Sequence, residues 1–159
     1  VLAGLLAVGV AHASDIEVGK YIYEYKAGTY TVQMLRYGPE SDNKFLIKVS
    51  GIHNDQDGKI YLHTKKCDTT KCEAYKYVTT EVHKPGGTQW FTVYNPGTWY
   101  RGDILQPYLV EPAKNDDKLY MGEKVQTNLD PAFFLANYKK QQSKIFIRKV
   151  IKSNFFQRF

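Results

Sequence analysis

The amino-acid sequence predicts a mainly β protein, an antiparallel β-sandwich or partly open barrel with one C-terminal helix. Residues 44–82 hold three strand-like runs in which apolar and polar side chains alternate with a period of two. Aromatic residues make up 14% of the chain and include 13 tyrosines, which favour pleated, half-buried surfaces. Asp130-Pro131 marks a helix start, because Asp caps free amide groups and Pro suits the first helical turn.

The first residues are typical of an export signal. Residues 1–13 carry no Lys, Arg, Asp or Glu and end in Ala11-His12-Ala13, the pattern of an apolar signal core and its cleavage site. No initiator Met or positively charged segment precedes them, so we expect the sequence to begin within the signal. A buried apolar helix is the alternative. Residues 14–159 would then form a single β-rich domain in an oxidising compartment, periplasmic or secreted.

A first hairpin is predicted over residues 20–36. Tyr21, Tyr23 and Tyr25 share one face of an extended segment, and Gly28 allows the chain to turn. The alternation resumes after this turn, so the segment has the pattern of two antiparallel strands.

A three-stranded meander is predicted over the runs 44–52, 59–66 and 73–82. Asp57-Gly58 indicates a tight turn between the first two runs, because Gly tolerates positive φ and Asp hydrogen-bonds the backbone of its own turn. Each run can bury one face and expose the other.

The only two cysteines, Cys67 and Cys72, lie five positions apart between the second and third runs. This spacing suits a disulfide across the mouth of a hairpin, if the two Cβ atoms come within about 4 Å. Such a small ring places the expected stabilisation at the low end of the usual range of about 2–4 kcal/mol. The alternative is a metal site built from both cysteines and His63, although structural zinc normally has four ligands at tighter spacings.

Two further sets of residues have part of a metal-site pattern. The Asp55-x-Asp57-Gly58 spacing resembles part of a calcium loop, but the full loop pattern would place His53 and Thr64 at ligand positions, where neither fits. His53 and His63 flank the same turn and could hold a metal together with His83 or Asp55. Histidines in strands and loops are more often surface residues, so we predict no metal and no cofactor.

Aromatic residues cluster after the meander. A strand is predicted at residues 89–94, and Trp90, Trp99 and Tyr100 lie beside Gly- and Pro-containing turns. These three side chains could form a recognition patch for a glycan or a protein. Packing in the core of a small β domain is the alternative. Residues 118–127 are predicted to contain one further short strand.

The C-terminal region is predicted to be a helix followed by a strand. Residues 132–142 form the body of the helix, with Phe134 and Tyr138 on one face. Residues 144–151 are rich in β-branched side chains, which favours a last strand. A basic amphipathic helix is the alternative for this segment.

The net charge of +6 is concentrated at the C-terminal end, since no Asp or Glu follows Asp130. The cations in this stretch are Lys139, Lys140, Lys144, Arg148, Lys149, Lys152 and Arg158. Such a one-signed segment indicates an acidic partner, and we predict that Arg148, Lys149 and Lys152 contact it. A solvated sheet edge guarded by lysines is the alternative. A membrane surface could also be contacted by this segment, and no nucleic-acid partner is expected.

The sequence contains no nucleophile elbow, P-loop, zincin motif or Cys-x-x-Cys pair. After residue 13 there is also no apolar stretch of the ~20 residues that a membrane-spanning helix needs. The sequence therefore favours an exported, non-catalytic binding protein of the bacterial envelope or extracellular space. It would be an inhibitor or immunity-type protein, or a small subunit of an envelope assembly. A small secreted hydrolase with an unrecognised site and an outer-membrane β-barrel are the alternatives.

Overall fold

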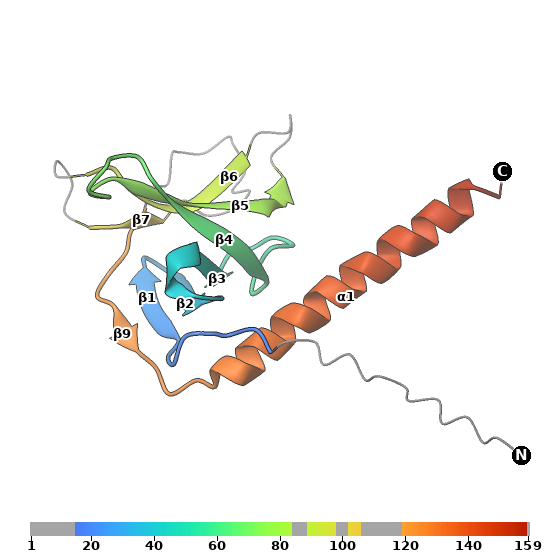
Figure 1. Cartoon of the computed structure of the whole chain (residues 1–159), viewed down its shortest axis with the longest axis horizontal. Coiled ribbons are helices and arrows are strands. Elements are labelled where there is room, and N and C mark those ends of the chain that lie inside the picture. The colour runs from blue at the N-terminus through green and yellow to red at the C-terminus, as the bar shows by residue number, and fades with distance from the viewer. Residues whose placement is uncertain (1–14, 84–88, 98–101, 106–118, 159) are drawn as a thin grey trace, which may run out of the picture.

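The computed structural model of the chain describes residues 15–83, 89–97, 102–105 and 119–158. It is mainly β, as predicted: one curled antiparallel sheet forms a half-barrel, and one long helix lies against it (Figure 1). The strands are β1 (Tyr23–Ala27), β2 (Tyr30–Arg36), β3 (Lys44–Ser50), β4 (Ile60–Cys67), β5 (Tyr75–His83), β6 (Gln89–Asn95), β7 (Ile104–Leu105), β8 (Leu119–Tyr120) and β9 (Val125–Gln126). A short 3-10 helix, η1 (Glu40–Asp42), joins β2 to β3, and the long helix is α1 (Pro131–Phe156).

The strand order β8-β7-β6-β5-β4-β3-β2-β1-β9 is a meander whose last strand returns to the first edge. β8 and β9 follow one another in the chain but lie at opposite edges of the sheet, so the segment between them spans the opening. The backbone N–H of Met121 donates to the carbonyl of Asp103 (2.8 Å), and that of Gly122 donates to the carbonyl of Lys26 (2.7 Å). The two edges of the half-barrel are thereby tied together.

The predicted hairpins are confirmed. β1 pairs with β2 around Gly28, which has a φ of 58°, and β3 pairs with β4 around the Asp57-Gly58 turn. Asp57 holds this turn, because its Oδ1 accepts hydrogen bonds from the backbone N–H groups of Gly51 (2.7 Å) and Ile52 (3.2 Å). The alternation seen in the sequence therefore sets the register of the sheet.

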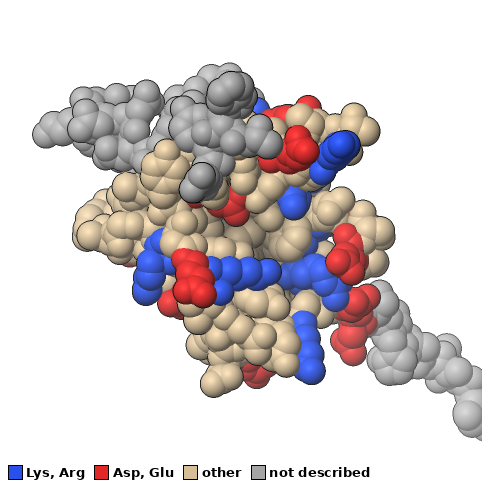
Figure 2. Space-filling model, turned by 90° about the vertical axis from the view of Figure 1, so that its left-hand side faces the viewer, with Lys and Arg blue, Asp and Glu red and all other residues tan. Residues whose placement is uncertain are grey.

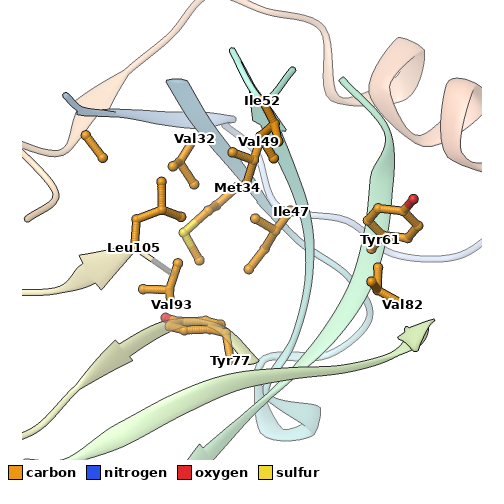
Figure 3. Packing of buried hydrophobic residues seen from close by; sticks show 11 residues of the cluster. Val32, Met34, Ile47, Val49, Ile52, Tyr61, Tyr77, Val82, Val93 and Leu105 are labelled. Carbon is orange, nitrogen blue, oxygen red and sulfur yellow. The ribbon is translucent and has the colours of Figure 1, made fainter. Parts of the chain in front are cut away.

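One set of alternating side chains fills the interior of the half-barrel (Figure 3). Ile47 of β3 pairs with Met34 of β2 on one side and with Tyr61 of β4 on the other. The cluster is Ala27, Val32, Met34, Ile47, Val49, Ile52, Tyr61, Tyr77, Val82, Val93 and Leu105. Burying an aliphatic side chain of this size contributes about 1.5–3 kcal/mol, so this cluster is the main source of stability.

A second, smaller cluster lies on the outer face of the sheet. Leu35, Leu46 and Ile60 point outward from β2, β3 and β4 and are covered by Phe134 and Tyr138 of α1. The helix begins as predicted, because the Asp130 side chain accepts a hydrogen bond from the backbone N–H of Ala132 (2.9 Å).

Two sequence predictions are wrong. Residues 144–151 are not a strand but continue α1 to Phe156, which agrees with the helical alternative. No Gly or Pro interrupts residues 132–156. Extending an existing helix is much easier than nucleating a new element, and β-branched residues lower helix propensity only slightly. Residues 119–126 form two short strands, β8 and β9, rather than one, because the chain crosses between the two sheet edges here.

Within the described ranges, no helix has both the length and the apolar character that crossing a bilayer requires.

Candidate functional site

The first half of α1 is fixed to the sheet by polar side chains as well as by its apolar face. In the described residues β4 pairs with β5 from Thr64 to Cys67, so Ile60 at the start of β4 lies outside this paired stretch. The side chain of Gln141 in α1 supplies hydrogen bonds to the backbone of Ile60. Its Oε1 accepts from the Ile60 N–H (2.9 Å), and its Nε2 donates to the Ile60 carbonyl (2.7 Å). The amide thus takes the place of a strand partner.

Glu81 of β5 makes the second polar connection. Its Oε2 accepts a hydrogen bond from the backbone N–H of Leu62 (2.8 Å), while its Oε1 accepts from the Tyr138 hydroxyl (2.6 Å) and from Gln142 Nε2 (3.0 Å). Burial, together with this hydrogen bond, raises the pKa of Tyr138 well above its usual range, so the hydroxyl remains a donor. Glu81 therefore joins β4, β5 and α1 at one point.

Beyond Gln142 the helix leaves the sheet. We call residues 143–156 of α1 the helical arm, and every one of them is exposed. Figure 1 shows this half projecting away from the half-barrel. Phe146, Phe155 and Phe156 are 68%, 63% and 79% exposed, although Phe is among the residues most often buried in folded proteins. The arm is thus a large apolar surface that the described part of the chain leaves uncovered.

The arm also carries the cations that the sequence singled out. At 100° per residue, Arg148, Lys149 and Lys152 fall on one side of the helix, because Lys152 follows Arg148 by four residues and Lys149 by three. None of the ion pairs within the described ranges involves them. Their assignment to partner binding stays a prediction, but the structure places all three on one exposed surface.

The predicted aromatic patch is not brought together by the described residues. Trp99 and Tyr100 lie outside them, and Trp90 is described only by its backbone position in β6. Phe91 and Tyr94 of the same strand contact each other, with ring centroids 5.3 Å apart, and both are half-buried. The patch stays a prediction.

Cys67 and Cys72 form a disulfide with a Cα–Cα distance of 4.8 Å, as predicted. It closes the β4–β5 turn, which Thr69 also stabilises, because its Oγ1 accepts hydrogen bonds from the backbone N–H groups of Glu73 (3.0 Å) and Ala74 (3.4 Å). A stable disulfide is compatible with an oxidising, non-cytoplasmic compartment.

The histidines do not form a metal site in the described residues. His53 is exposed in the β3–β4 turn, whereas His63 is fully buried inside the half-barrel. The carbonyl of Tyr61 lies 2.9 Å from Nδ1, so Nδ1 carries the proton; Nε2 accepts from the Thr92 hydroxyl (2.6 Å). Burial lowers the pKa of His63 from 6.5 to about 3. No group of three His, Cys, Asp or Glu side chains in the described ranges could hold a metal ion.

A pocket lies where the interior of the half-barrel reaches the surface, beside η1. It has a volume of about 510 Å³ and is lined by Gly19, Lys20, Tyr21, Tyr23, Tyr25, Met34, Arg36, Glu40, Asn43, Phe45, Lys65, Tyr77 and Lys124. We call it the tyrosine pocket. Among the described residues, its lining thus combines aromatic rings with four cations and one carboxylate.

Three lysines of the tyrosine pocket lie over aromatic rings. The Lys65 ammonium is 4.1 Å from the ring centroid of Tyr75, and Lys124 is 3.9 Å from that of Tyr23. Lys20 is 5.2 Å from the ring of Tyr21. Such contacts contribute about 0.5–1 kcal/mol at exposed sites. They hold the ammonium groups in place without neutralising their charge.

Lys20 and Lys124 belong to the segments that lead into β1 and β9, the strands at the left-hand side of Figure 1. Figure 2 looks onto that side and shows Lys and Arg side chains in a band across the middle of the face, with Asp and Glu side chains beside it. The cations therefore form one band across this face and are not spread evenly over it.

The tyrosine pocket was missed from the sequence, although part of its signal was present. Tyr61, His63 and Lys65 alternate along β4 and so share its inner face, where a lysine is unexpected. The other lysines come from distant parts of the chain, which no local pattern connects.

Comparison of the chain with protein-family models, with curated proteins and with solved structures found no match. The helical arm and the tyrosine pocket are therefore interpreted from their own chemistry.

Proposed function

We propose that this chain is an exported, non-catalytic binding protein of the bacterial envelope or extracellular space, and that the helical arm docks onto an acidic partner protein. The observation that carries the proposal is the arm itself, residues 143–156, exposed along its whole length and free of Asp and Glu. An inhibitor or immunity-type protein and a small subunit of an envelope assembly both fit such an arm.

The apolar side chains of the arm support a partner. Phe146 and Val150 lie four residues apart, as do Ile147 and Ile151, and together they lie on the side opposite Lys152. Soluble monomers rarely expose contiguous apolar surface of this kind. Helices bind grooves through residues spaced three and four apart, which is the pattern here.

The positions of the remaining apolar residues favour a protein over a membrane. At 100° per residue, Ile145 and Phe156 fall between Lys149 and Lys152, on the cationic side of the helix. A bilayer covers one side of an interfacial helix and leaves the other in water, so these two side chains would stay exposed. A protein groove can enclose both sides.

The charge of the arm favours an acidic partner over a second copy of the chain. Two arms packed together would bring like charges close, and the arm contains no carboxylate to offset them. An acidic surface would instead attract the arm and raise the association rate, an effect that salt screens with a Debye length of about 10 Å at 0.1 M.

The test compares two triple variants of the chain starting at Ser14. One carries Arg148→Gln, Lys149→Gln and Lys152→Gln. The control carries Lys26→Gln, Lys59→Gln and Lys71→Gln, which remove the same charge from exposed sites outside the arm. Partners are captured from the chain's own envelope extract at increasing salt, and their affinity is then measured with the purified proteins. We expect equal melting temperatures, weakened and less salt-sensitive binding for the arm variant, and unchanged binding for the control.

Three outcomes would overturn the proposal. The arm variant could bind the captured protein as tightly as wild type at every salt concentration. The wild-type chain could instead float with anionic lipid vesicles, which would assign the arm to a membrane surface. It could also be a dimer by light scattering that the arm variant disrupts, which would assign the arm to self-association.

A further inference from the structure

The tyrosine pocket has the dimensions and the lining of a small-molecule site. Its volume of about 510 Å³ lies within the range of roughly 300–1,000 Å³ typical of ligand pockets. Met34 and Tyr77 at its floor belong to the buried cluster of the half-barrel, so the pocket is an opening into the interior rather than a groove between loops.

Lys65 is the most informative residue of the pocket. It follows Tyr61 and His63 on the inner face of β4, and its ammonium lies 4.1 Å from the Tyr75 ring and 6.0 Å from the Tyr77 ring. The residue is half-buried. A partly desolvated charge normally needs a counter-charge. Yet none of the ion pairs in the described ranges includes Lys65.

Among the described residues, no carboxylate forms an ion pair with a lysine of the pocket. Glu40 is the acidic residue of the lining and is exposed on η1. The Oδ1 of Asp103 accepts hydrogen bonds from the Tyr75 hydroxyl (2.5 Å) and Asn95 Nδ2 (3.3 Å). Of the cations in the lining, Arg36 pairs with Glu17 (2.8 Å). The ammonium groups of Lys20, Lys65 and Lys124 have no ion pair within the described ranges, so they remain for a ligand.

The aromatic rings supply the second half of the recognition chemistry. Tyr21, Tyr23 and Tyr25 come from one segment, and Tyr77 faces them from β5 across the pocket. Burial raises the pKa of Tyr25 to about 12, so its hydroxyl stays protonated and able to donate. Tyrosine combines a flat apolar surface with a polar tip, which suits a ring that carries oxygen substituents.

We propose that the tyrosine pocket binds a small ring-bearing organic anion, whose acidic group is held by Lys65 and Lys124 and whose ring packs on the tyrosines. Acidic sugars and aromatic carboxylic acids share this chemistry. The site does not include the helical arm, so the failure of either proposal would leave the other one unaffected.

The test uses isothermal titration of the full chain with two anions and their neutral counterparts: glucuronate against glucose, and cinnamate against cinnamyl alcohol. We expect a dissociation constant of about 0.1–1 mM for at least one anion, as is usual for ligands of this size, weaker binding at high salt, and no binding of its neutral counterpart. Glucuronate binding alone would assign an acidic sugar, and cinnamate binding alone an aromatic acid.

Substitutions locate the site. Lys65→Gln removes a half-buried cation and is expected to weaken binding by about tenfold or more. Lys124→Gln removes an exposed one and should weaken it by about two- to fivefold. Lys26→Gln is the matched control, because this lysine lies on the outer face of β1 with a side chain 69% exposed. It should bind like wild type, and so should the arm triple variant.

The proposal is overturned if neither anion binds saturably up to about 10 mM, if the neutral counterparts bind equally well, or if Lys65→Gln and Lys124→Gln both keep wild-type affinity. If Lys65→Gln fails to fold by circular dichroism, the double variant Lys20→Gln, Lys124→Gln decides, since both residues are exposed. Loss of binding in Lys26→Gln to the same extent would show a general charge effect and would equally overturn the site.

Discussion

The two halves of α1 differ in almost everything except their backbone. Residues 131–142 place Phe134 and Tyr138 on the outer face of the sheet and connect Gln141 to the backbone of β4. Residues 143–156 are just as apolar in places but are exposed throughout. Continuity of the helix, and not burial, therefore determines the secondary structure of the second half. Residues 131–142 are needed by the fold, and residues 143–156 remain for binding.

The largest expected effect compares the same substitution in both halves. Phe134 is 6% exposed and Phe146 is 68% exposed. Phe134→Ala should lower the free energy of unfolding by about 3–5 kcal/mol, because it leaves a cavity under the helix. Phe146→Ala should change it by less than about 0.5 kcal/mol. Urea denaturation followed by circular dichroism measures both, and similar losses for the two variants would show that the arm is covered in the isolated chain.

The pH dependence of stability should come from the sheet and not from the arm. His63 is buried and neutral, with its pKa lowered from 6.5 to about 3, so between these values the unfolded chain binds more protons than the folded one. Stability is therefore fully present above about pH 7 and falls as the pH is lowered, by about 2 kcal/mol between pH 7 and pH 5. The arm contains no Asp, Glu or His, so it adds nothing in this range.

A variant of His63 isolates this contribution. His63→Gln keeps a polar side chain near Thr92 but cannot become charged, so its denaturation curves should differ less between pH 7 and pH 5 than those of the wild type. His53→Gln is the control, because His53 is exposed. An unchanged pH dependence in His63→Gln would contradict the assignment.

The features predicted from sequence are those that neighbouring residues determine. Alternation along β3 and β4 sets their register, the Asp57-Gly58 turn joins them, and the cap at Asp130 begins the helix. The Cys67–Cys72 bridge follows from a spacing of five residues. Each of these features depends on a short stretch of chain whose geometry the local residue types restrict.

The features that were missed depend on contacts between distant segments. Residues 144–151 have strand-like composition, and the uninterrupted helix before them decides their conformation. The tyrosine pocket joins Lys20, Lys65 and Lys124 from three separate segments. Lys65 alone was recognisable, as a lysine in an inward-facing position of β4.

A smaller effect tests the polar contacts of the packed half. Gln141→Ala removes the acceptor and the donor that satisfy the backbone of Ile60. Because a buried backbone group is left without its partner, the free energy of unfolding should fall by about 1–2 kcal/mol. Gln157→Ala, at the exposed end of the helix, should be close to neutral. Equal effects of the two substitutions would mean that water replaces Gln141 without cost.

The smallest expected effect is that of removing the arm altogether. A chain ending at Gln142 keeps Phe134, Tyr138 and Gln141, the residues that hold α1 to the sheet. The new helix end exposes the carbonyls of its last turn, but Lys139 and Lys140 then lie where positive charge favours a helix C-terminus. The free energy of unfolding should therefore change by about 0.5 kcal/mol or less, which lowers the melting temperature by no more than about 2 °C. The far-ultraviolet helical signal should fall at the same time, because the arm is more than half of α1. A loss of several degrees would contradict the separation between the two halves, and it would show that the arm contributes to the stability of the half-barrel.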